Sequence, residues 1–494
     1  MRKLHAFSAI LWSGGELVFR QGLQLVTTLV LARLLSPVDF GLVAMLAVFI
    51  AVATVVVDGG LTTALIQRQD ADHIDESSVF WFNLGSGVLV SGALFAAAPA
   101  ISLFFERPEL ASLARLMTLV VLFSATSCVH AALLSKRLDF RTQAKAGFFS
   151  AFLSGLVAIV MALAGFGVWS LAVQAVLMAL LMSSALWMLH SWRPTFVISV
   201  ASLKKLSSFG AYHLGSSLLE AFYSRLYTLL IGRAFGARDL GYYGFAENIR
   251  QMPVGFTISV LSRVALPLFS TTSDDRALLR RGMQLSIRAS TLLLAPVMFG
   301  LAAVADSLVP AAFGKQWVSA VPILQVLSIA GALYPIQVIN LNALMAQGHA
   351  HLMFRLEVAK KGFGIALILL GLSYGLMGIA WSQLAFVLIA FVINTRYAER
   401  FAAYGLLNQL RDVLPALVVS GSMAVLVSFV GRSLDWPPSM KLLVLVPLGV
   451  VIFAVLVHLF RLKAYQELLE LLANWRNRSH QSDRQQLLPE KGES

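Results

Sequence analysis

Apolar stretches long enough to cross a bilayer recur along the whole chain, separated by short polar segments. About 20 apolar residues in a helix span the hydrocarbon core. The alternation typical of outer-membrane strands does not occur in the sequence. The pattern therefore predicts an all-α integral membrane protein with about fourteen transmembrane helices, expected at 10–34, 40–60, 78–101, 112–134, 147–166, 168–190, 206–234, 240–262, 285–309, 319–345, 358–376, 378–396, 413–431 and 440–460.

Two distant stretches repeat one pattern. Residues 28–44 read TLVLARLLSPVDFGLVA, and residues 228–244 read TLLIGRAFGARDLGYYG. In both, an apolar run ends in an arginine, crosses a short polar turn and enters a second apolar run. A duplicated multi-helix unit is typical of transporters whose site lies between the repeats. The alternative is an ancient gene fusion with no bearing on the present site.

The repeat predicts how the chain is divided. Odd-numbered spans repeat onto odd-numbered spans, so the two units have the same orientation, and their pseudo-symmetry axis is expected along the membrane normal with a central cleft between two six-helix lobes. The predicted parts are an N-terminal lobe at 1–190, a basic cytoplasmic connector at 191–205, a C-terminal lobe at 206–400, an additional helix pair at 401–460 and a cytoplasmic tail with an interfacial helix at 461–494.

Composition and charge agree with a membrane protein. The chain is 58% hydrophobic and 13% charged, with a mean hydropathy of +0.79. The net charge of +13 could suggest nucleic-acid binding. However, the predicted cytoplasmic segments hold 25 of the basic residues against 8 on the opposite side. This is the positive-inside bias. It places both termini in the cytoplasm, and no nucleic-acid partner is expected.

Polar residues inside two repeat-related helices form matching stripes. Charges at the centre of a span are costly and usually line a cavity or pair. Spacings of three and four residues place each set on one helix face. An internal pair between Glu16 and Arg20 is the alternative for the first helix. The stripes comprise Ser13, Glu16, Arg20, Gln24 and Thr27 in the first helix, and His213, Ser217, Glu220, Ser224 and Tyr227 in the seventh.

The candidate binding residues come from the stripes, from the eighth span and from Arg225, which lies off the stripe of the seventh helix. Arginine offers a planar fork suited to phosphate, so Arg20, Arg225 and Arg250 are predicted to hold an anionic head group. Gln24 and Ser224 are predicted to add polar contacts to the substrate. The carboxylates Glu16, Glu220 and Glu247 are predicted to bind a coupling ion, H⁺ or Na⁺, or to pair with the arginines.

Other polar residues receive structural interpretations. Asp58 ends the second span, where capping or a salt bridge with Arg68 is expected. Arginine and aspartate six residues apart in the two repeat turns, Arg33–Asp39 and Arg233–Asp239, are expected to lock those turns. His349 and His351 lack a third ligand nearby, and no nucleophile or phosphate-loop motif occurs. No catalytic residues, metal or cofactor are therefore expected.

Three stretches in the first half carry a family resemblance. They are LARLLSPVDFGLVAMLAVFIAVATVVVDGGLTTALIQRQD (31–70), SVFWFN (78–83) and LLSKRLDFR (133–141). They resemble the polysaccharide-exporting flippases of the multidrug/oligosaccharidyl-lipid/polysaccharide exporter superfamily. The resemblance implies alternating-access translocation of an undecaprenyl-pyrophosphate-linked oligosaccharide from the inner to the outer leaflet of the bacterial inner membrane, for exopolysaccharide or O-antigen synthesis.

The implied partners are the lipid-linked oligosaccharide, membrane lipids, a coupling ion and a polysaccharide polymerase. Two other functions stay open at this point. One is a cation-coupled multidrug exporter, although cleft arginines favour an anionic substrate over cationic drugs. The other is a membrane polymerase or glycosyltransferase of the same pathway. Such an enzyme is expected to carry a sizeable extracytoplasmic loop, and the predicted loops here are short.

Overall fold

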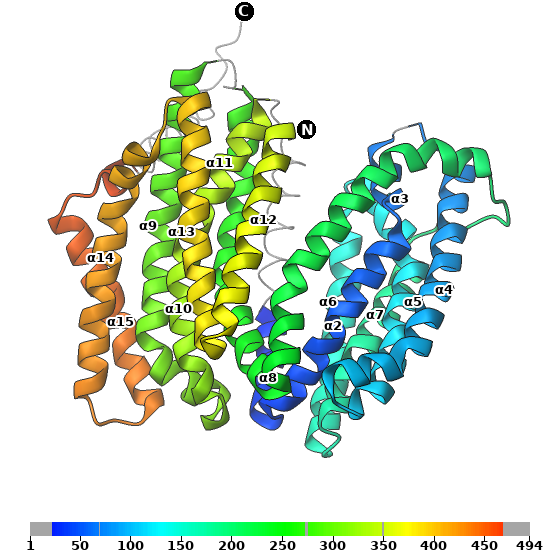
Figure 1. The fold of residues 1–494 in the computed structure, drawn as a ribbon, viewed down its shortest axis with the longest axis horizontal. Helices are drawn as coiled ribbons and strands as arrows, with labels where there is room; N and C mark the ends of the chain where they lie inside the picture. The colour runs from blue at the N-terminus through cyan, green and yellow to red at the C-terminus, as the bar shows by residue number, and fades with distance from the viewer. Residues whose placement is uncertain (1–21, 69, 272–274, 348–349, 468–494) are drawn as a thin grey trace, which may run out of the picture. The chain divides into compact units, whose positions relative to one another are not determined.

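The computed structural model describes residues 22–68, 70–271, 275–347 and 350–467 (Figure 1). Within these ranges the secondary structure is helical and contains no β-strand. Ten of the described helices are long and apolar enough to cross a membrane. The predicted all-α membrane class is confirmed, whereas the count of fourteen spans stays a prediction.

The chain forms two compact units, Met1–Gly244 and Phe245–Ser494, and the boundary falls inside α8. The helices of the first unit follow one another with short connections, so sequence neighbours pack as antiparallel pairs. Its described helices are Gly22–Leu34, α2 (Pro37–Asp58), α3 (Leu61–Gln67), α4 (His73–Phe105), α5 (Glu109–Lys136), α6 (Phe140–Leu163), α7 (Val168–Leu189) and the first part of α8 (Val200–Thr271).

The second unit has the same kind of construction. A π-helical turn (Val309–Phe313) and a 3₁₀ turn (Lys315–Ala320) lead from α9 into α10. One of its buried clusters includes Ile287, Ile336 and Val387, from three different helices. Besides the end of α8, the unit consists of α9 (Arg276–Leu308), α10 (Val321–Ala332), α11 (Tyr334–Ala346), α12 (Ala350–Leu372), α13 (Gly375–Ala402), α14 (Leu406–Ser433) and α15 (Pro438–Leu459).

Helix α8 contains the break that the repeat predicts. Gly236 has φ 84° and ψ −176°, outside the helical region, so α8 is two helices joined at this residue. A positive φ favours glycine because a Cβ would clash with the backbone. The break falls between the predicted spans 206–234 and 240–262. It also corresponds in the repeat to Ser36, where α2 begins.

The turn before α2 is fixed by a capping box. The Ser36 hydroxyl accepts a hydrogen bond from the Asp39 backbone N–H, and the Asp39 carboxylate accepts one from the Ser36 N–H at 2.8 Å. Pro37 occupies the first turn, where its missing N–H costs nothing. Asp39 therefore acts at the helix start, as the sequence indicated.

The connector after α7 is tied to α4. The Trp81 indole donates to the Thr195 carbonyl at 2.8 Å, and Phe196 stacks on Trp81. The Ser199 backbone N–H donates to the Ser78 hydroxyl at 2.9 Å. Trp192 is buried in the cluster that contains Phe80. Residues 190–199 therefore pack against α4 of the first unit.

The start of the tail packs against the second unit. Residues 463–467 are helical, and Leu462 lies in a buried cluster with Leu292 of α9. Arg288 pairs with Asp412 of α14 at 2.6 Å and also with Glu467 of the tail. A buried ion pair needs this additional bonding to offset its desolvation. The predicted interfacial helix stays a prediction, because most of its length lies outside the described residues.

Candidate functional site

The two repeat turns pack on each other reciprocally. A Cβ added to Gly41 would lie 1.7 Å from the Ala237 carbonyl oxygen, and one added to Gly241 would lie 1.9 Å from the Pro37 carbonyl oxygen. Residue 37 corresponds to 237 in the repeat, and 41 to 241. Each glycine therefore receives the backbone of the other copy's turn. This local pseudo-twofold contact lies within the first unit.

Arg233 stabilises the same end of the first unit. Its guanidinium donates to the Glu106 carboxylate at 2.6 Å and lies over the Phe104 ring. The sequence predicted a turn lock between Arg233 and Asp239, and that partner was wrong. Glu106 ends α4 in the left-handed conformation, which turns its side chain across the gap between helices. The pair depends on this tertiary contact and has no local sequence signal.

The predicted polar face of α8 is exposed at Glu220 and Ser224 and partly buried at Ser217 and Tyr227. Arg225, which lies off this stripe, is also exposed, as is Gln24 of the first repeat helix, whereas Thr27 of that helix is buried. The Ser224 hydroxyl donates to the Ala221 carbonyl at 3.1 Å, which leaves its oxygen able to accept a bond. Glu16 and Arg20 lie outside the described residues. Exposed charges inside a predicted membrane span favour water over lipid as their surroundings.

Thiol labelling tests whether this face meets water. Phe222 is 55% exposed and lies roughly 200° around the helix from Ser224, so the two positions are accessible on opposite faces. In a Cys128→Ala background, Ser224→Cys and Glu220→Cys are expected to react rapidly with a small charged thiol reagent. Phe222→Cys is the matched control and is expected to react at least tenfold more slowly, because lipid excludes the reagent. Equal rates at 222 and 224 would contradict a water-facing stripe.

Arg250 occupies a different environment. It is 4% exposed and packs against Gly331 of α10. Its guanidinium forms a two-point ion pair with Glu247, including a bond of 2.9 Å from Nε, and a bond of 3.2 Å to the Gln251 side chain. Glu247 is one turn away on the same helix, so this pairing could be predicted from the spacing in the sequence. Arg250 belongs to the second unit and Arg225 to the first.

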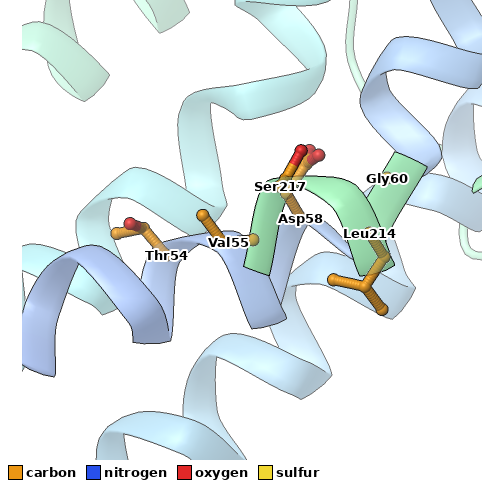
Figure 2. A pocket seen from close by; sticks show the side chains of 6 residues that line it. All are labelled: Thr54, Val55, Asp58, Gly60, Leu214 and Ser217. Carbon is orange, nitrogen blue, oxygen red and sulfur yellow. The ribbon is translucent and has the colours of Figure 1, made fainter. Parts of the chain in front are cut away.

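A cavity that the sequence interpretation missed lies beside the end of α2. Its volume is about 180 Å³. Figure 2 shows the side-chain oxygens of Asp58 and Ser217 pointing to the same side. Ser217 belongs to the predicted stripe, whereas Asp58 was expected to be a simple cap or ion-pair residue. The lining residues are Thr54, Val55, Asp58, Gly60, Leu214 and Ser217.

The expected partner of Asp58 bonds elsewhere. Arg68 donates from Nε to the Asp70 carboxylate at 2.8 Å, and Lys205 lies 3.9 Å from the same residue. The Arg68 hydrogen bond holds the pKa of the Asp70 carboxyl below its usual range. Gly59 and Gly60 both have positive φ and turn the chain sharply between Asp58 and Arg68. The predicted Asp58–Arg68 bridge is therefore wrong, because this turn separates the two side chains.

Two solved structures share the fold of this chain. The lipid II flippase MurJ in its inward closed conformation matches with a TM-score of 0.75 and 15% identity, over 93% of this chain and 100% of that one. An inward-facing multidrug resistance MATE family transporter of the MOP superfamily matches with a TM-score of 0.62 and 15% identity, over 78% of this chain and 96% of that one. The chain therefore has the fold of these two proteins, with ten described helices long and apolar enough to cross a membrane.

Sequence comparisons define the family. Residues 30–322, more than half of the chain, match the family described as polysaccharide biosynthesis protein. The teichuronic acid biosynthesis protein TuaB of Bacillus subtilis is 30% identical over 390 residues, 78% of this chain and 80% of TuaB. The lipopolysaccharide biosynthesis protein WzxC of Escherichia coli is 30% identical over 433 residues, 84% of this chain and 86% of WzxC. The chain belongs to this polysaccharide biosynthesis family, which confirms the resemblance.

A third relative bears on transport. The succinoglycan biosynthesis transport protein ExoT of Rhizobium meliloti is 34% identical over 315 residues, which is 64% of each chain. The family match and the apolar helices confirm the expectation of a membrane protein of polysaccharide biosynthesis, and the name of ExoT states a role in transport for that relative.

Proposed function

We propose that this protein flips a polyprenyl-pyrophosphate-linked oligosaccharide from the inner to the outer leaflet of the bacterial inner membrane, with both termini in the cytoplasm. The observation that carries the proposal is the group of exposed polar residues on α8, where Glu220 and Ser224 share one face and Arg225 lies beside that face. Family membership supports a glycan substrate. The names of the relatives, which refer to teichuronic acid, succinoglycan and lipopolysaccharide synthesis, also support a glycan, and the likeness in fold to the lipid II flippase MurJ supports one carried on a lipid.

In this proposal the parts of the substrate are bound differently. Arg225 and Arg20 bind the pyrophosphate, since guanidinium groups form paired charge-assisted hydrogen bonds to phosphate oxygens. Gln24 and Ser224 bind the adjacent sugars, and the lipid tail stays in the bilayer. Glu220 and Glu16 bind the coupling ion or hold the arginines in place. Arg250 is buried and pairs with the half-buried Glu247, and this pair supports the second unit, while a direct substrate contact by Arg250 stays a prediction.

A cation-coupled drug exporter is the second candidate, supported by the likeness in fold to the multidrug transporter. Family membership and the basic side chain at 225 favour the anionic glycan lipid over cationic drugs. A polymerase partner is an expectation of the proposed pathway, in which the flipped oligosaccharide is the substrate of polymerisation.

A reconstitution assay tests the function. Liposomes with the purified protein and a fluorescent polyprenyl-pyrophosphate oligosaccharide are expected to expose inner-leaflet glycan to an external lectin much faster than protein-free liposomes. The control is the same lipid carrying a single phosphate and no glycan, which is expected to move more slowly because both recognition elements are reduced. If neither lipid moves while a cationic dye is exported, the drug-exporter candidate replaces the proposal.

A further inference from the structure

We propose that the cavity between the end of α2 and the first part of α8 binds a hard monovalent cation, with the Asp58 carboxylate and the Ser217 hydroxyl as ligands. Both residues line the same cavity and present their oxygens to the same side (Figure 2). Carboxylate and hydroxyl oxygens are the donors that hard cations prefer. Only the role of this site in transport rests on the proposed function, because cation binding itself is inferred from the geometry of the cavity.

The electrostatics of α2 favour a positive charge at this place. Asp58 is the last residue of α2, where the helix dipole presents its negative end, and the last turn contains no basic residue. In the part of the chain that the structure describes, no ion pair neutralises Asp58, because Arg68 and Lys205 are both directed to Asp70. A carboxylate in this position is repelled by the helix end, and a bound cation removes that repulsion.

The cavity is held open by a rigid frame. Gly60 has a positive φ, and a Cβ there would lie 2.2 Å from the Gly210 carbonyl oxygen of α8. On the other side, the Asn83 amide of α4 donates to the Thr62 hydroxyl of α3 at 3.5 Å and to Cys128 at 3.0 Å. The glycine contact fixes the end of α2 against α8, and the Asn83 hydrogen bonds fix α3 against α4 and α5. The ligand oxygens are therefore positioned before a cation binds.

The donor set selects a monovalent ion. One carboxylate balances one positive charge, whereas dedicated Ca²⁺ sites recruit several carboxylates. Among the described residues, no group of three or more histidine, cysteine, aspartate or glutamate side chains could hold a metal ion. Thr54 also lines the cavity. Its hydroxyl donates to the Ala51 carbonyl at 2.9 Å, so its oxygen keeps lone pairs that can accept a cation. Na⁺ is therefore the probe of choice.

Direct binding of ²²Na⁺ to the purified full-length protein in detergent tests the inference. The wild type is expected to bind Na⁺ saturably at constant ionic strength with choline as the replacement ion. Asp58→Asn keeps the shape of the side chain and removes its charge, so it is expected to abolish saturable binding. Ser217→Ala removes a neutral ligand and is expected to weaken binding several-fold.

Asp70→Asn is the matched control. It removes a nearby exposed carboxylate that is paired with Arg68, and it is expected to bind Na⁺ like the wild type. Saturable binding that Asp58→Asn leaves unchanged, or no saturable binding by a monodisperse wild-type protein, would overturn the inference. The assay contains no glycan lipid, so a protein that binds Na⁺ at Asp58 and yet fails to flip the lipid would refute the proposed function alone.

Discussion

Replacement of Arg225 with alanine is expected to reduce flipping of the lipid-linked oligosaccharide at least tenfold, while the protein still inserts and purifies normally. Arg225 is exposed on α8, so its removal leaves no buried charge unpaired. A hydrogen bond to a charged group contributes about 1.5–3 kcal/mol, which corresponds to about a tenfold to hundredfold change. Arg20→Ala is expected to act in the same way, and the double variant to abolish flipping.

Two variants make this prediction specific to the guanidinium group. Arg225→Lys keeps the charge without the planar fork and is expected to restore flipping only in part. Arg238→Ala removes another exposed arginine of α8, outside the predicted span, and is expected to flip normally. Arg250→Ala is a poorer test, because it leaves Glu247 without its buried partner and lowers stability. Normal flipping by a well-expressed Arg20→Ala, Arg225→Ala variant would rule out this phosphate site.

Addition of one methyl group at Gly41 or Gly241 is expected to destabilise the first unit and impair transport. The new Cβ would lie 1.7 Å or 1.9 Å from a backbone carbonyl oxygen, so no side-chain rotation relieves the clash. Overpacking of this kind typically costs about 1–3 kcal/mol and occasionally more. The melting temperature of purified Gly41→Ala and Gly241→Ala is therefore expected to fall by several degrees.

Gly244→Ala is the control for this contact. It lies one turn beyond Gly241 on α8, and a Cβ there meets nothing within 4 Å. Its melting temperature is expected to equal that of the wild type or to rise slightly, since alanine favours the helix. The double variant at 41 and 241 is expected to cost less than the sum of the single variants, because one separation of the turns relieves both clashes. Full additivity would indicate two independent sites.

The reciprocal glycine contact also bears on the transport cycle. Alternating access in duplicated transporters proceeds by motion of repeats against each other. The two turns belong to different repeats, yet they lie in contact within one compact unit. A contact built from backbone atoms and glycine can separate and close again without rearranging side chains. We expect the glycine variants to affect the flipping rate even at temperatures where they are fully folded.

The amino-acid sequence by itself determined the class of protein, the approximate helices and the repeat. Hydrocarbon thickness imposes a minimum length of apolar sequence on every span, so local composition is sufficient to locate most of them. The break of α8 at Gly236 was predictable for a similar reason, because the repeat placed a polar turn there. The Arg250–Glu247 pair was also within reach of the sequence, since residues three apart on a helix are neighbours.

Tertiary structure alone decided which distant groups meet. Arg233 binds Glu106, 127 positions away, because the left-handed end of α4 directs that side chain across the helices. Asp58 joins Ser217 at a cavity and not Arg68, because Gly59 and Gly60 turn the chain between the two. Gly41 and Gly241 were visible as repeat partners, but their mutual backbone contacts required the packed helices. Local sequence sets length, polarity and helix face, whereas these pairings depend on how the faces pack against one another.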